Sequence, residues 1–272
     1  MAHPKRPIAF VLTASNHGTM IVNRHDHAVQ NNHAFGVGHQ ILSRSCFDPS
    51  EVEFVLALLS RRRDHFGDDV FAIDGGANIG VHSVEWARHM YGWGRVLSFE
   101  AQETVFYALA GNLVLNNCLN ARAKLAALGE SVGEITIPQP DYFSAASFGS
   151  LELRRREGTQ YIGQDISYDA AAGVAVPMVT IDSLDLPRVD FLKLDVEGME
   201  MDVLRGATNT LKRCTPICLV EYIKSDREAL SAYLTDLGYT SIYVAEPNII
   251  AIHESDPTRQ NIVLQDRSLT IV

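Results

Sequence analysis

The chain has 272 residues, of which 46% are hydrophobic and 21% are charged, the balance of an ordinary globular protein and not of a disordered one. Its formal net charge of -10 opposes general attraction to nucleic acid. The four cysteines form no CxxC pair, so neither a disulfide scaffold nor a structural zinc site is expected.

The start of the chain carries no targeting signal that we recognise. Met1 to Pro7 is polar, and the apolar run from Ile8 to Thr13 is too short for a signal-peptide core or a membrane span. Together with the free thiols, this predicts a cytoplasmic protein without a membrane partner.

Residues 1–66 are expected to form an N-terminal appendage. Residues 8–14 and 19–23 favour strands and flank a turn at Asn16-His17-Gly18, which predicts a hairpin. The His- and Asn-rich stretch from His25 to His39 shows no period and is expected to be an unordered loop, although His25 and His27 could be metal ligands.

A helix is expected from Pro49 to about His65, because Asp48 can cap it and Pro49 suits its first position. The short basic runs at 61–63 and 154–156 are expected to be solvated surface. His82 is expected either to face a crevice or to lie on a helix surface.

From residue 67 onward, short apolar runs alternate with helical stretches. This alternation predicts an α/β fold with a mostly parallel sheet and helices on both faces. The expected strands are 70–73, 95–99, 123–128, 134–137, 191–194, 217–220, 241–244 and 249–253, and the expected helices are 79–90, 104–115, 200–211 and 227–237. Residues 67–272 thus form the main domain, with an insertion at 138–177 that is either a lid or binding loop, or a disordered excursion.

The first strand of this domain ends in a glycine-rich turn, Asp74-Gly75-Gly76-Ala77-Asn78-Ile79-Gly80. A strand, a glycine turn and a helix in this order form a nucleotide site, but the glycines do not follow the dinucleotide pattern GxGxxG. A carboxylate at Asp74 would repel a pyrophosphate and attract the ammonium and sulfonium of S-adenosylmethionine, unless it only caps the helix. The turn therefore predicts S-adenosylmethionine as cofactor. The binding residues expected in it are Asp74, Gly75, Gly76, Ala77, Asn78 and Gly80.

Glu100 ends the second strand, where a carboxylate can accept hydrogen bonds from both ribose hydroxyls of the cofactor. Strand order places Ala101, Gln102 and the backbone near Ala127 beside the adenine, unless these residues only pack. The glycine turn with Asp74 and the carboxylate of Glu100 therefore both predict the same kind of ligand, a cation that carries an adenosine.

A second constellation, Asp195-Val196-Glu197-Gly198, follows the strand 191–194. Asp195 lies at the sheet edge beside the cofactor crevice, so we expect it to contact the cofactor and to act as a base or orient the acceptor, with Glu197 assisting. Glu200 and Asp202 are expected only to complement a helix dipole. No metal is expected, although Asp195 and Glu221 end adjacent strands and could together hold Mg²⁺.

Residues 70–222 resemble the FkbM family of S-adenosylmethionine-dependent methyltransferases. The matching segments are Ile73 to Gly80, Phe99-Glu100, Asn112, Thr180 to Leu184, Leu192 to Gly198, Val203 to Ala207, and Pro216 to Glu221. The resemblance implies the class I, Rossmann-like methyltransferase sheet, seven-stranded with an antiparallel last hairpin strand. It also implies O-methylation, often of sugar or natural-product hydroxyls. After Phe99-Glu100 the family usually has proline, whereas this chain has Ala101-Gln102.

We therefore expect an enzyme that methylates a hydroxyl of a small-molecule or glycan acceptor by in-line transfer, without a nucleic-acid partner. Three alternatives stay open: a methyltransferase that acts on protein or RNA, a non-catalytic cofactor-binding module, and a dehydrogenase. The sequence names neither the acceptor nor the oligomeric state.

Overall fold

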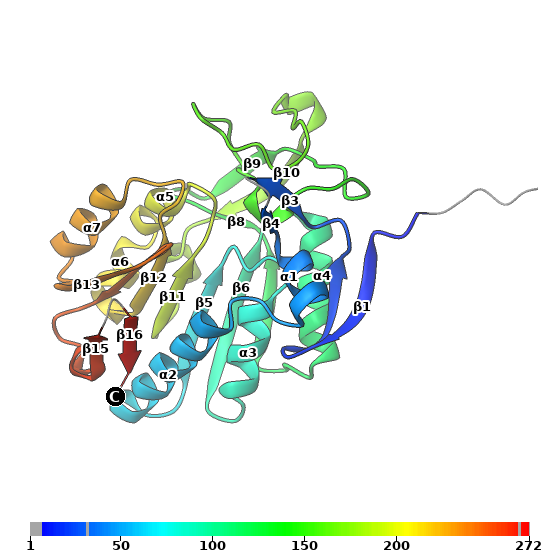
Figure 1. Ribbon diagram of the computed structural model, residues 1–272. Coiled ribbons are helices and arrows are strands. Elements are labelled where there is room, and N and C mark those ends of the chain that lie inside the picture. Colours follow the sequence, from blue (N-terminus) through cyan, green and yellow to red (C-terminus); the bar gives the residue numbers. More distant parts are fainter. Residues whose placement is uncertain (1–6, 31–32, 266–267, 272) are drawn as a thin grey trace, which may run out of the picture.

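The computed structural model describes residues 7–30, 33–265 and 268–271 (Figure 1). Met1 to Arg6, on which the expected location partly rests, and residues 31–32 of the expected loop lie outside the described residues. None of the helices in the described ranges combines the length and the apolar character that a bilayer span requires.

A seven-stranded sheet in the order β13-β14-β12-β11-β5-β6-β7 forms the centre of the molecule (Figure 1). Its strands are β5 (Val70–Gly75), β6 (Gly94–Glu100), β7 (Ala121–Leu125), β11 (Phe191–Leu194), β12 (Ile217–Glu221), β13 (Ser241–Ala245) and β14 (Asn248–Ile252). Every neighbouring pair is parallel except the two pairs made by β14, which is antiparallel to β12 and β13. The α/β architecture and the antiparallel strand of the last hairpin are confirmed.

Helices cover both faces of this sheet. One face carries α2 (Pro49–Phe66), α3 (Val81–His89) and α4 (Glu103–Leu115), and the other carries α5 (Glu200–Arg205), α6 (Thr208–Cys214) and α7 (Arg227–Asp236). Because side chains alternate along a strand, Ala72 packs into the first core and Ile73 into the second. The single helix expected over 200–211 is wrong, since the chain turns at Gly206, where a Cβ would lie 2.1 Å from the carbonyl oxygen of Gly129.

A second, smaller sheet has the order β8-β10-β9. It consists of β8 (Ala127–Leu128), β9 (Gly133–Ile137) and β10 (Val174–Val179), so the strand expected over 123–128 is divided between two sheets. The end of the expected insertion is therefore a strand. The basic run at 154–156 is exposed, as expected, and two of its residues also make ion pairs, Arg154 with Asp202 and Arg156 with Glu152.

The N-terminal hairpin is confirmed as β1 (Phe10–Ser15) and β2 (Gly18–Asn23), and it packs against α4. The unordered loop expected over 25–39 is wrong. It contains β3 (Ala28–Gln30), β4 (His33–Phe35) and the start of α1 (Val37–Arg44). These elements are too short to show a period, and a buried tertiary contact fixes them: Asp26 accepts the N–H of Gly38 (2.8 Å).

The chain does not close on β14, as expected, but continues into a further hairpin. A short 3-10 helix, η4 (Pro257–Asn261), leads into β15 (Ile262–Gln265) and β16 (Ser268–Ile271). The buried Arg62 of the basic run at 61–63 ties this region to the domain by ion pairs with Asp190 (3.0 Å) and Asp256 (2.6 Å). Arg62 is therefore a structural residue and not part of a solvated surface.

Candidate active site

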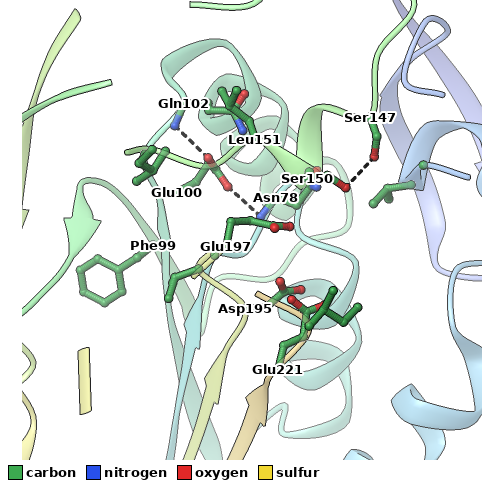
Figure 2. Close-up of a pocket in the computed structure, with 18 of the residues that line it drawn as sticks. Asn78, Phe99, Glu100, Gln102, Ser147, Ser150, Leu151, Asp195, Glu197 and Glu221 are labelled. Atoms are coloured by element: carbon green, nitrogen blue, oxygen red, sulfur yellow. Dashed lines mark hydrogen bonds between the residues drawn. The ribbon is translucent and has the colours of Figure 1, made fainter. Parts of the chain in front are cut away.

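A cavity of about 330 Å³ opens at the carboxyl ends of β5, β6, β11 and β12 (Figure 2). In doubly wound sheets this edge is where ligands bind. Several site residues expected from the sequence line the cavity together: Gly76, Asn78, Glu100, Ala101, Ala127, Asp195 and Glu197. The structure thus brings the glycine turn and the second constellation to one place.

The glycine turn is compact because it lies between two strand ends. Gly76 has φ 75°, and a Cβ there would lie 1.8 Å from the carbonyl oxygen of Asp195. The N–H groups of Gly76 and Ala77 donate to the carbonyl of Phe99 (3.1 and 2.8 Å). Position 76 therefore requires glycine, and the backbone of Gly76 lines the cavity.

Asp74, Gly75, Ala77 and Gly80 do not line the cavity, so direct contact of these residues with a cofactor stays a prediction. The carboxylate of Asp74 is buried and accepts from the hydroxyl of Ser83 (2.6 Å), so it does not cap α3. Its other oxygen, Oδ1, has no hydrogen-bond partner among the described residues. An unpaired buried acceptor under the turn is costly unless a cation lies nearby, and Lys193 supplies one.

Glu100 lies at the end of β6, where its two oxygens bridge two segments. Oε2 accepts the N–H of Asn78 (2.9 Å), and Oε1 accepts the N–H of Gln102 (2.8 Å; Figure 2). Burial raises the pKa of the Glu100 carboxyl to about 7, although these N–H donors oppose the shift. A carboxyl held this rigidly can accept further hydrogen bonds from a ligand in the cavity.

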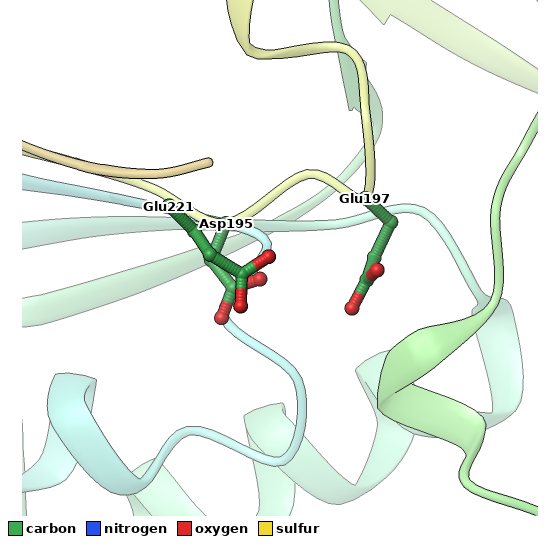
Figure 3. Close-up of side chains that lie close together, drawn as sticks. All are labelled: Asp195, Glu197 and Glu221. Atoms are coloured by element: carbon green, nitrogen blue, oxygen red, sulfur yellow. The ribbon is translucent and has the colours of Figure 1, made fainter. Parts of the chain in front are cut away.

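Asp195, Glu197 and Glu221 form a carboxylate cluster, in which one oxygen of each lies within 4.8 Å of the others (Figure 3). Asp195 and Glu221 meet because β11 and β12 are paired neighbours. Lys193 pairs with Asp195 (3.1 Å), and Lys224 pairs with Glu197. The sequence suggested Glu221 only as a possible metal ligand, because its strand was expected to end beside the strand of Asp195.

Burial, and then repulsion from Asp195, raises the pKa of Glu197 to about 8 and that of Glu221 to about 9. Such a cluster can hold a proton between its members, and in the described part of the chain it is the grouping of three ligand-type side chains that could hold a divalent cation.

Glu200 holds the turn that carries the cluster. Its buried carboxylate accepts the N–H groups of Val196 and Gly198 (both 3.1 Å) and the hydroxyl of Ser225. The expectation that Glu200 only complements a helix dipole is therefore wrong. Asp202 pairs with Arg154.

Two of the histidines make buried structural contacts. His82 is buried beneath α2, where its Nε2 lies 3.0 Å from Glu51, so neither position expected for it is correct. The ring of His17 lies 2.9 Å from Glu85.

Two further segments complete the cavity. Ser147, Gly149, Ser150, Leu151 and Leu153 come from the insertion, which agrees with the binding loop that was one of the two alternatives expected for it. Phe35, Gly36, Val37, Gln40, Phe47 and Asp48 come from the N-terminal appendage. No motif in either segment identified these individual residues.

Comparison with known proteins places this site in a family. The family described as "Methyltransferase FkbM domain" matches residues 74–241. Methyltransferase 1 of Beauveria bassiana is 30% identical over 150 residues, which is 52% of this chain and 59% of that protein. Methyltransferase sdnD of Sordaria araneosa is 26% identical over 192 residues, which is 62% of this chain and 73% of that protein.

The solved structures that resemble the chain are more distant. A methyltransferase FkbM from Methylobacillus flagellatus has 17% identity and a TM-score of 0.46, covering 68% of this chain and 44% of that one. An O-methyltransferase from Thermotoga maritima has 11% identity and a TM-score of 0.42, covering 98% of this chain and 88% of that one. At these scores neither likeness bears on the acceptor.

Proposed function

Because this chain belongs to the FkbM methyltransferase family, we propose that it is an S-adenosylmethionine-dependent O-methyltransferase acting on a hydroxyl of a sugar or natural-product acceptor. The methyltransferase activity follows from the family. The cofactor, the transfer to oxygen and the acceptor class are the proposal. The observation that carries it is the backbone contact between Gly76 and Asp195, which sets a carboxylate cluster directly beside the glycine turn.

The residues present fit S-adenosylmethionine. The backbone of Gly76 lines the cavity beside Asp195, and Glu100 presents a carboxylate there that can accept from the two hydroxyls of a ribose. The ionisable side chains among the described residues that line the cavity are all carboxyls, and none is Lys or Arg. Such a lining suits a sulfonium and an ammonium, and it disfavours the pyrophosphate of a dinucleotide.

When bound, the cofactor supplies an activated methyl group, so the protein has mainly to orient the acceptor and to remove its proton. We assign the removal of that proton to the carboxylate of Asp195. Lys193 fixes its carboxylate, and Lys224 fixes the neighbouring Glu197 while also donating to the carbonyl of Ser150 (2.7 Å). The cluster can then accept the hydroxyl proton as the oxygen is methylated.

The test has two stages. Calorimetry should detect binding of S-adenosylhomocysteine and no binding of NAD. Incubation with S-adenosylmethionine and a panel of hydroxylated sugars and natural products should release S-adenosylhomocysteine and yield methyl ethers by mass spectrometry. Binding of NAD in place of S-adenosylhomocysteine would reject the cofactor. Methylation of protein or RNA, with no hydroxyl acceptor methylated, would reject the acceptor class.

A further inference from the structure

The end of the cavity beside Asp195 and Glu221 has a composition of its own. We propose that this end is the acceptor subsite, that Phe47 and Asp48 of the N-terminal segment form its outer wall, and that it selects by charge. Hydroxylated acceptors that carry an amine bind best, neutral ones bind less well, and those with an acid group beside the reacting hydroxyl are rejected. This inference rests on the proposed function and adds the location and the charge preference of the subsite.

The two ends of the cavity are built by different segments. Glu100 and Gln102 lie with the insertion, because the side chain of Gln102 donates to the carbonyl of Phe148 (2.8 Å). The opposite end combines residues of the appendage with residues beyond β12 and before β14. These are Phe47, Asp48, Ile223 and Pro247.

The start of α2 is fixed over this opposite end. Glu51 accepts from the side-chain amide of Asn248 (2.6 Å), and Asn248 is the register partner of Glu221 across the sheet. Just before α2, the N–H of Phe47 donates to Nε2 of His17 (2.8 Å). These contacts hold the appendage against the ends of β12 and β14, so it is a permanent wall of the cavity.

Asp48 is the residue of this wall that points to a ligand role. It stands at the N-cap of α2 with φ 37°, a conformation rare outside glycine, and its carboxylate makes no cap hydrogen bond. The cap role expected from the sequence is therefore wrong. Asp48 lines the cavity. Burial, and then repulsion from Glu51, raises the pKa of its carboxyl, and Asp195 adds a smaller contribution.

The carboxyls at this end are crowded. Asp195 and Glu197 have lysine partners, whereas within the described ranges no ion pair involves Asp48 or Glu221, and burial together with neighbouring carboxyls raises the pKa of both. An amine in the acceptor would favour the ionised form of these carboxyls and pair with it, and a further acid group would increase the repulsion. The exposed side chain of Ile223 and the ring of Phe47 offer apolar contact for the body of the acceptor.

The experiment measures binding of matched probes to the full chain saturated with S-adenosylhomocysteine. The probes are methyl glucoside, its 6-amino-6-deoxy derivative and the corresponding methyl glucuronide, and ligand-observed NMR gives their dissociation constants. We expect the amine to bind at least about tenfold more tightly than the acid, with the neutral sugar between them. Equal or tighter binding of the acid, or no binding of the amine and the neutral sugar, would overturn the proposal.

Two variants test whether Asp48 causes the preference for the amine over the acid. Asp48→Asn keeps a residue that tolerates this backbone conformation, and it should reduce the amine-to-acid ratio about threefold or more while leaving the affinity for S-adenosylhomocysteine unchanged. Glu53→Gln removes the same charge from an exposed position of α2 outside the cavity and should leave the ratio unchanged. Equal effects of the two variants would reject Asp48 as part of the subsite. Failure of S-adenosylhomocysteine to bind the unmodified protein would instead reject the proposed function.

Discussion

Gly76 and Asp195 touch through their backbones, although 118 residues separate them along the chain: a Cβ at position 76 would lie 1.8 Å from the carbonyl oxygen of Asp195. The contact exists because β5 and β11 are paired neighbours that end at the same edge of the sheet. The glycine turn and the carboxylate cluster are thereby parts of one site.

This contact predicts the effect of a single methyl group. Gly76→Ala combines a positive φ with a backbone collision, so the free energy of unfolding should fall by more than about 2 kcal/mol and binding of S-adenosylhomocysteine should be lost. Gly92→Ala is the matched control, since Gly92 also has a positive φ (83°) but nothing lies within 4 Å of its Cβ position. It should cost only about 1–2 kcal/mol in urea unfolding. Equal losses in the two variants would contradict the role of the contact.

Glu100 should govern cofactor affinity in a pH-dependent way. Glu100→Gln should weaken S-adenosylhomocysteine binding about 10- to 100-fold, because hydrogen bonds to a charged acceptor contribute about 1.5–3 kcal/mol. The pKa of Glu100 is raised to about 7, so the affinity of the unmodified protein should increase as the pH rises through this value and the carboxylate forms. Calorimetry across that range should show no such increase in the variant. The control is Glu103→Gln, a neighbour bonded to Tyr107 outside the cavity.

Asp195→Asn separates chemistry from binding. The amide cannot take up the hydroxyl proton, so turnover should fall about 100-fold or more, whereas the affinity for S-adenosylhomocysteine should change less than about threefold. Asp202→Asn, which removes a carboxylate paired with Arg154 outside the cavity, should be nearly silent in the same assay. Full activity of Asp195→Asn would remove this residue from the mechanism.

The carboxylate cluster can be tested for a metal role in the same assay. Lysine partners already neutralise Asp195 and Glu197, so we expect turnover to survive a chelator. Turnover that is lost with the chelator and restored by Mg²⁺ would assign the cluster to a cation, and would replace the proton role of Asp195.

Asp26 joins the two outer walls of the cavity, because its oxygens accept the N–H of Gly38 in the appendage (2.8 Å) and of Phe148 in the insertion (3.0 Å). Asp26→Asn leaves one of these buried donors unpaired and should lower the free energy of unfolding by about 1–3 kcal/mol. Asp141→Asn, an exposed carboxylate of the insertion, is the control and should cost less.

The loss of stability in Asp26→Asn should depend on pH in a definite direction. Burial raises the pKa of Asp26 from 3.8 to about 6, so the folded protein binds a proton at this group in a range where the unfolded chain has released it. The stability that Asp26 contributes is complete below the lower value and is lost as the pH rises through about 6. The difference in urea stability between the unmodified protein and the variant should therefore narrow from pH 4 to pH 7. A difference in urea stability that widens from pH 4 to pH 7 would contradict a raised pKa of Asp26 in the folded protein.

The sequence by itself determined the α/β class, most of the central strands and helices, the glycine turn, and the places of Glu100 and Asp195 after their strands. These features are local: strands and helices of this length show their own period, and parallel strands bring their carboxyl ends to one edge. The family resemblance rested on the same local segments, and the family match over residues 74–241 confirms it.

Only the tertiary structure decided where the short and aperiodic segments lie. The stretch from His25 to His39 folds because Asp26 reaches across to Phe148, a contact that no local pattern records. Asp48 reads as a helix cap in the sequence, yet its carboxylate is left free of the helix and lines the cavity. A pattern reports which face of an element is buried, whereas the walls of the cavity depend on contacts between segments far apart in the chain.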